Sequence, residues 1–178
     1  MTSHYSSLGI GLLDCIIGII ACLGFSPILL FGAVFYYANY TILVPSVLLL
    51  GFSRYANGVG VQSIPSWLRY FHMVIGVVII IIALVPVYLI YFYPSVFAVG
   101  WLNLALVAFS CDLLISGMSF TGISQAYDWF SFAIGITGVI LASIVQFIPF
   151  LIVLLTVGFF IAGIFTSITG VLVVLTNW

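Results

Sequence analysis

Very few side chains in this sequence could do chemistry. The chain has 178 residues, but only two arginines, three aspartates and two histidines, and it has no lysine or glutamate. Four of these residues, Asp14, Arg54, His72 and Asp112, lie inside or beside long apolar runs. An ionisable group at the centre of a membrane helix costs about 2.5–3.5 kcal/mol on insertion scales, so it is a candidate for a function.

These residues fit two kinds of intramembrane chemistry, and the sequence leaves both open. Asp14 and Asp112 could form ion pairs with Arg54 or Arg69, which would be a structural role. Alternatively, Asp14, His72 and Asp112 could form the entrance for a proton or another ion. A third arrangement has the long side chains simply extending towards water. All four residues of this candidate polar cluster stand near those ends of their apolar runs that would lie on one side of the membrane. We therefore expect them at one depth.

Other reactive groups lack the partners that a cofactor or an enzyme needs. Cys15, Cys22 and Cys111 lie in apolar segments without a C-x-x-C motif, so we expect free thiols and no metal site. A chain without lysine cannot form a retinal Schiff base. A haem would have only His4 and His72 as histidine ligands, and a single haem on His72 is the arrangement left open. We therefore expect no cofactor and no enzymatic activity.

The composition predicts a membrane protein. Hydrophobic residues make up 66% of the chain and charged residues 3%, whereas a soluble domain carries about 25% charged residues. A spanning helix needs about 20 apolar residues, so the chain can form about six. The N-terminal stretch MTSHYSSLG has no lysine or arginine, so we expect no cleaved signal peptide. We expect one membrane domain, residues 1–178, with membrane lipids and not nucleic acid as its partners.

Six apolar runs predict an all-α fold of six transmembrane helices. The runs are 8–25, 27–52, 67–93, 94–120, 129–148 and 149–175. Pro27, Pro94 and Pro149 open the second, fourth and sixth runs, and proline fits the first turn of a helix. The prolines therefore predict tight turns that join the helices into three helical hairpins.

The remaining two connections, 53–66 and 121–128, are longer and polar. Arg54 and Arg69 flank the first of them, and short loops that carry positive charge stay on the cytoplasmic side. We therefore expect both connections and both termini in the cytoplasm of a multi-pass cell-membrane protein. Asp128 precedes the fifth helix, where the helix dipole would favour its charge.

The hairpins also align as parallel internal repeats. WLRYFHMVIGVV aligns with WFSFAIGITGVI, and CIIGII aligns with MVIGVV. The alignments give each first helix a central glycine for packing: Gly18, Gly76 and Gly138. Repeats with the same orientation are related by an axis along the membrane normal. We expect a pseudo-threefold or sequential bundle with repeat units of about 8–58, 67–117 and 129–178.

Small and amide residues predict close contacts between helices. In GFFIAGIFTSITG, Gly158 and Gly163 each begin a small-xxx-small pair, which lets helices approach closely. Their partner could be this bundle or another subunit. Asn39, Asn103 and Gln146 lie deeper, where we expect hydrogen bonds between helices. They would serve transport only if several of them faced one cavity.

The repeat pattern resembles the HdeD-like family of small six-span membrane proteins. The matching pieces are RYFHMVIGVVIIIIALVP, FSFAIGITGVILASIVQFIP and LLDCIIGIIACLGFSP. The first unit departs from the pattern, having Gly9 and Gly11 where Trp67 and Arg69 stand in the second. The resemblance implies a non-catalytic membrane protein with a role in stress or acid tolerance. An accessory subunit of a larger membrane complex and a small proton, ion or solute transporter are the alternatives, and we expect a homo-oligomer or other membrane subunits as partners.

Overall fold

The computed structural model describes residues 2–31, 40–61, 63–89, 97–119, 121, 124–147 and 152–176. Within these ranges the chain is all-helical, as predicted. The helices are α1 (Thr2–Phe31), α2 (Tyr40–Gly60), α3 (Ser66–Leu89), α4 (Phe97–Met118), α5 (Gln125–Phe147) and α6 (Ile152–Thr176).

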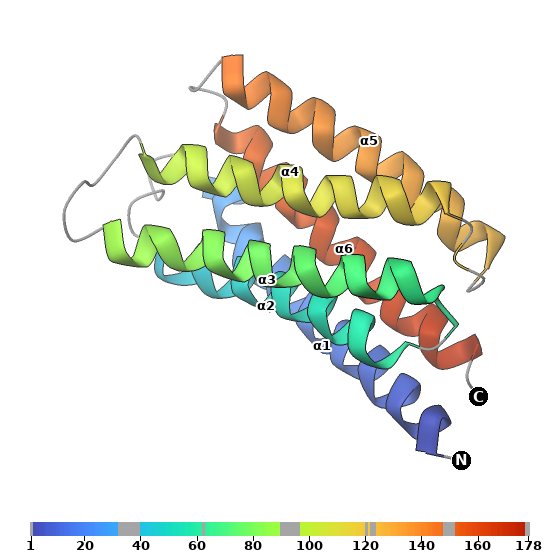
Figure 1. Cartoon of the computed structure of the whole chain (residues 1–178). Coiled ribbons are helices and arrows are strands. Elements are labelled where there is room, and N and C mark those ends of the chain that lie inside the picture. The colour runs from blue at the N-terminus through green and yellow to red at the C-terminus, as the bar shows by residue number, and fades with distance from the viewer. Residues whose placement is uncertain are drawn as a thin grey trace.

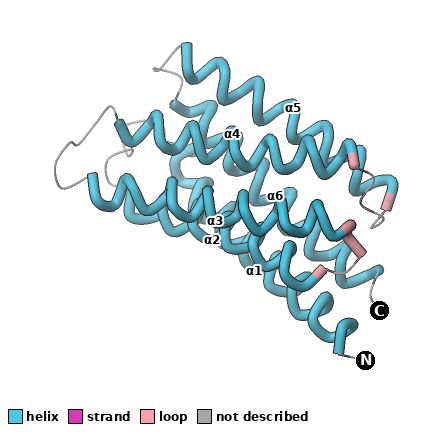
Figure 2. The backbone as a smooth tube through the Cα atoms, in the orientation of Figure 1, coloured by secondary structure: helices cyan, strands magenta, loops and turns pink. Residues whose placement is uncertain are grey.

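The six helices lie side by side in one bundle (Figure 1). Both chain ends lie at the same end of this bundle as the α2–α3 and α4–α5 connections, whose described residues Figure 2 draws as loops. We call this end of the bundle the polar end. Consecutive helices contact one another, and α6 returns to contact α1, so the helices form a closed ring.

Five of the helices contain a stretch long and apolar enough to cross a membrane. These stretches are Ser7–Gly24, Ser66–Val85, Gly100–Met118, Gln125–Phe147 and Leu154–Thr176. Large apolar side chains also cover the outside of the bundle: on α3, Tyr70, Val74 and Ile81 are all more than half exposed. A protein with such an apolar surface would aggregate in water. These features are compatible with a multi-pass membrane protein.

The predicted turn at Pro27 is wrong. α1 continues as a helix through Pro27 to Phe31, and the next described helix begins at Tyr40. Proline can lie inside a membrane helix, because neighbouring groups satisfy the backbone carbonyl that proline leaves unpaired. Pro94 and Pro149 lie outside the described residues.

Both predicted polar connections are shorter than the sequence indicated. α2 continues to Gly60, so most of the expected loop 53–66 is helical, and Arg54 lies inside a helix. α5 begins at Gln125, which places Asp128 in its first turn and not before it. Ser53, Arg54 and Asn57 of α2 are buried in the bundle, which is why a polar stretch here does not mark a loop.

The most extensive helix contacts join α1 to α6, α2 to α3 and α4 to α5. The contacts of α1 with α2, of α3 with α4 and of α5 with α6 are less extensive. Each odd-numbered helix therefore packs most widely on a helix other than its partner in the predicted hairpins. The wide contacts alternate with the narrower ones around the ring.

Each of these wide contacts contains one of the three glycines that the repeat alignment places at corresponding positions. A Cβ atom added to Gly18 would lie 2.5 Å from the carbonyl oxygen of Gly163 on α6, and one added to Gly76 would lie 2.5 Å from the backbone nitrogen of Tyr55 on α2. A Cβ atom on Gly138 would overlap the hydroxyl of a serine on α4. The glycines thus allow the close approach of α1, α3 and α5 to their neighbours.

Gly158 and Gly163 of α6 also face helices of the same chain. A Cβ atom on Gly163 would meet Cys22 of α1 at 2.9 Å, and one on Gly158 would meet the end of the Leu106 side chain on α4 at 2.6 Å. Both glycines therefore serve packing inside this bundle.

Candidate functional site

The structure brings together the four residues of the predicted polar cluster. Asp14, Arg54, His72 and Asp112 come from α1, α2, α3 and α4 and are at most 1% exposed. Arg54, His72 and Asp112 each stand six residues from the polar end of their helix. At 1.5 Å per residue this is a depth of about 9 Å. The cluster is a single layer, closed off from the surface.

Asp112 is the centre of the charged part of the cluster. His72 Nδ1 lies 2.6 Å from Asp112 Oδ1, within hydrogen-bond distance. Arg54 Nη1 lies 3.6 Å from the other carboxylate oxygen, which is the distance of an ion pair and not of a hydrogen bond. One carboxylate on α4 thus holds a residue from α2 and a residue from α3.

Asp14 is satisfied differently, by neutral donors on α2. The Ser53 hydroxyl donates to Asp14 Oδ1 at 2.7 Å, and Asn57 Nδ2 donates to Asp14 Oδ2 at 2.6 Å. Asn57 also donates to the carbonyl oxygen of Ser53 at 2.9 Å, which fixes its amide group. The sequence reasoning missed Ser53 and Asn57, although their spacing of four residues would place them on one face of a helix.

Arg54 lies among aromatic side chains from three other helices. Its guanidinium carbon is 4.9 Å from the ring centre of Phe109 on α4 and 5.6 Å from that of Phe165 on α6. Such cation–π contacts are worth about 2 kcal/mol when water is excluded. The buried Tyr127 of α5 also faces Arg54. Arg54 thus ties α2 to α4, α5 and α6.

Arg69 and Asp128, the other two charged residues, lie outside the cluster. Arg69 donates from Nε to the carbonyl of Gly58 at 3.1 Å and from Nη2 to that of Val59 at 2.9 Å. It therefore caps the last turn of α2, where backbone carbonyls lack helical partners. Asp128 accepts hydrogen bonds from the backbone and the hydroxyl of Thr121, at 3.0 Å and 2.6 Å. Of the proposed rim pairs, the structure contains the one between Arg54 and Asp112.

A second polar contact lies deeper in the bundle. Asn103 Nδ2 of α4 donates to Gln146 Oε1 of α5 at 3.2 Å, which is a hydrogen bond between helices as predicted. Asn39 lies outside the described residues. The interior between this contact and the cluster is filled by fully buried apolar side chains, among them Leu50, Leu106 and Phe159. In the described part of the chain the two polar layers are therefore separate.

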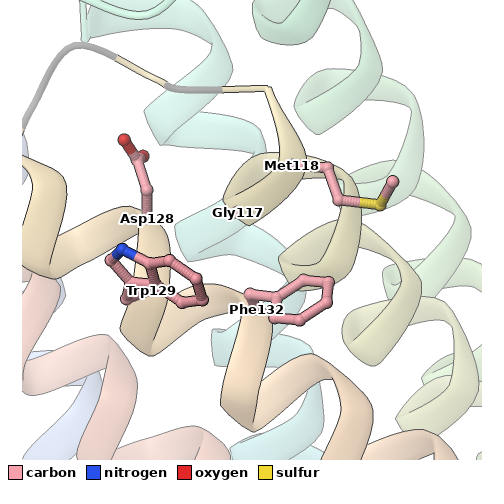
Figure 3. A pocket seen from close by; sticks show the side chains of 5 residues that line it. All are labelled: Gly117, Met118, Asp128, Trp129 and Phe132. Atoms are coloured by element: carbon pink, nitrogen blue, oxygen red, sulfur yellow. The ribbon is translucent and has the colours of Figure 1, made fainter.

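Two grooves open on the outside of the bundle near its polar end, and neither is lined by a cluster residue. One, of about 280 Å³, lies between α4 and α5 and is lined by Gly117, Met118, Asp128, Trp129 and Phe132. In Figure 3 the rings of Trp129 and Phe132 come from α5 and Met118 comes from α4, while the Asp128 carboxylate points away from both rings. The other, of about 290 Å³, lies between α2 and α3 and is lined by Gly58, Val59, Ser66, Arg69, Tyr70 and Met73.

The cluster has the groups to hold charge but lacks those of a metal centre. Among the described residues, no three His, Cys, Asp or Glu side chains are grouped so that they could hold a metal ion. With a neutral His72 the four residues carry a formal charge of −1, so one added proton would make the cluster neutral. His72 Nε2 and Arg54 Nε have no hydrogen-bond partner within the described residues.

Comparison with known proteins gave no relative from which a role could be transferred. No protein-family model, no curated protein and no solved structure matches this chain.

Proposed function

We propose that this chain is a non-catalytic integral membrane protein that acts through contacts with other membrane-embedded helices. The observation that carries the proposal is the enclosure of Asp14, Arg54, His72 and Asp112, which are buried and bonded to one another or to α2. Groups that are enclosed and paired in this way hold helices together. What the bundle offers to its surroundings is its apolar outer face.

We further propose that the six helices span a cell membrane as three hairpins in parallel repeats, with both termini and the polar end in the cytoplasm. The common end of the chain termini and the polar connections supports this topology, and so does the position of Arg69 at that end. The resemblance to HdeD-like proteins, and with it a role in stress or acid tolerance, belongs to the same proposal.

Cysteine labelling tests the topology. In a variant without Cys15, Cys22 and Cys111, single cysteines at Ser63 and Phe147 would be exposed at opposite ends of the bundle. A maleimide that cannot cross membranes should label them from opposite sides of sealed vesicles. Labelling of both from one side would refute the proposed topology.

The mass of the complex extracted in mild detergent tests the mode of action. We expect a homogeneous homo-oligomer, because the surface that the described helices offer to a partner is mainly apolar. Stoichiometric foreign chains would instead identify an accessory subunit of a larger membrane complex. A lone monomer would contradict both forms of the proposal.

A small proton or ion transporter is the second candidate, and the unpartnered nitrogens of His72 and Arg54 favour it. The buried apolar layer around Leu106 and Phe159 argues against a continuous route, since a pathway must cross both leaflets. Proton flux in liposomes decides between the two candidates. Flux that is lost in Asp14→Asn or Asp112→Asn, but kept in Asp128→Asn, would establish transport.

A further inference from the structure

We propose that the groove between α2 and α3 binds the headgroup of an anionic phospholipid, with Arg69 contacting the phosphate. This inference rests on the proposed location in a membrane with the polar end at its surface. It assigns a ligand to a site that is separate from the buried cluster.

The position of the groove suits a lipid headgroup. It lies where α2 ends and α3 begins, at the polar end of the bundle, and has a volume of about 290 Å³. Gly58 lines it at a close approach of the two helices, since a Cβ atom there would lie 2.5 Å from the carbonyl oxygen of Arg69. Grooves with a basic residue between membrane helices, on the cytoplasmic side, are typical sites for anionic headgroups.

Arg69 supplies the positive charge. Within the described ranges it forms no ion pair with a carboxylate, whereas Arg54 is buried and paired with Asp112. A guanidinium has five N–H donors in one plane, and two of them hold the carbonyls of Gly58 and Val59. The remaining donors belong to a group already fixed in place, which lowers the entropy cost of binding a phosphate.

The outer face of α3 provides a surface for the acyl chains. Trp67 and Tyr70 are exposed at the level of the groove, where aromatic rings favour the membrane–water interface. Below them Val74, Ile81 and Leu84 are exposed along the same helix at intervals of three to seven residues. A lipid with its headgroup at Arg69 would lay its chains on this apolar stripe.

The groove between α4 and α5 is a natural control, because it has a similar size but the opposite charge. Its volume is about 280 Å³, and Gly117 and Met118 take the places of Gly58 and Val59. The carbonyl oxygen of Asp128 lies against Gly117 as that of Arg69 lies against Gly58, so Asp128 takes the place of Arg69. The lining of this second groove includes Asp128 and no basic residue, so an anionic headgroup has nothing to bind there (Figure 3).

Lipid binding to the full chain in detergent tests the proposal by native mass spectrometry. Phosphatidylglycerol should be retained in preference to phosphatidylcholine. Arg69→Gln should weaken phosphatidylglycerol binding about tenfold, which corresponds to about 1.4 kcal/mol. Arg69→Lys should keep most of the preference, because it keeps the charge. Phe132→Ala in the second groove should leave the preference unchanged.

Three results would overturn the proposal: equal retention of the two lipids, equal preference in Arg69→Gln and wild type, or loss of the preference in Phe132→Ala. Loss of phosphatidylglycerol when inorganic phosphate is added at the same concentration would also contradict it. The site would then bind an anion without a lipid. If the chain inserts into liposomes but shows no lipid preference, this inference alone fails. If it does not insert, the proposed function fails.

Discussion

Neutralising either Asp112 or Arg54 should destabilise the bundle, because the two residues form one buried ion pair. Asp112→Asn removes the charge that faces both His72, at 2.6 Å, and Arg54, at 3.6 Å. It leaves Arg54 fully buried without its carboxylate. Breaking a buried pair from one side costs about 3–5 kcal/mol, so we expect a loss of this size in the free energy of unfolding.

Arg54→Met should cost a similar amount, about 3–5 kcal/mol, because it leaves the buried carboxylates of Asp112 and Asp14 without their cation. This loss includes the contacts of the guanidinium with Phe109 and Phe165. The double variant contains no unpaired guanidinium and no unpaired carboxylate at these positions. It should therefore be more stable than Asp112→Asn alone, with a coupling energy of about 1–3 kcal/mol between the two sites.

The assay is reversible unfolding of the purified chain in mild detergent as a denaturing detergent is added. Arg69→Gln combined with Asp112→Asn is the matched control, because Arg69 caps α2 and does not touch the cluster. Those two effects should add. Strict additivity of the Arg54 and Asp112 effects, or equal coupling of Asp112 to Arg69, would refute the reasoning.

Two further substitutions test the packing and the α4–α5 connection. Gly76→Ala should lower the free energy of unfolding by about 1–3 kcal/mol, because its Cβ atom would meet the backbone of Tyr55. Gly100→Ala is the control in the same denaturation assay. A Cβ atom at Gly100 would have no neighbour within 4 Å, so this change should alter the free energy of unfolding little. Asp128→Ala removes both hydrogen bonds to Thr121, so the connection before α5 should exchange its amide hydrogens faster while the interior of α4 stays protected, and unchanged exchange would contradict this role.

The central glycines could be found in the sequence, and the pairing of the helices could not. An apolar membrane helix has little use for glycine except where a neighbour approaches closely, so Gly18, Gly76 and Gly138 stand out. The sequence does not say which neighbour approaches. Short connections suggested α1 with α2, whereas the small residues of α6, such as Gly163, allow α1 to pack most widely there.

The depth of the polar cluster could be predicted, but the hydrogen-bond partners of Asp14 could not. Asp14, His72 and Asp112 stand at similar distances from the ends of their apolar runs, which was enough to expect one layer. The sequence predicts Ser53 and Asn57 in a loop, because polar stretches of soluble proteins mark surface segments. In a bundle surrounded by apolar side chains, the interior is where such groups find hydrogen bonds.

The wide contact between α1 and α6 joins parts of the chain that are synthesised at well-separated times. The Cys15 thiol donates to the carbonyl oxygen of Ser167, 152 residues later. Chains are made from the N-terminus at about 5–20 residues per second, so the glycine-lined face of α1 has no α6 to cover it for the time needed to add those residues. A chain released before α6 would keep that face open, and the ring of helices closes only after α6 has been made.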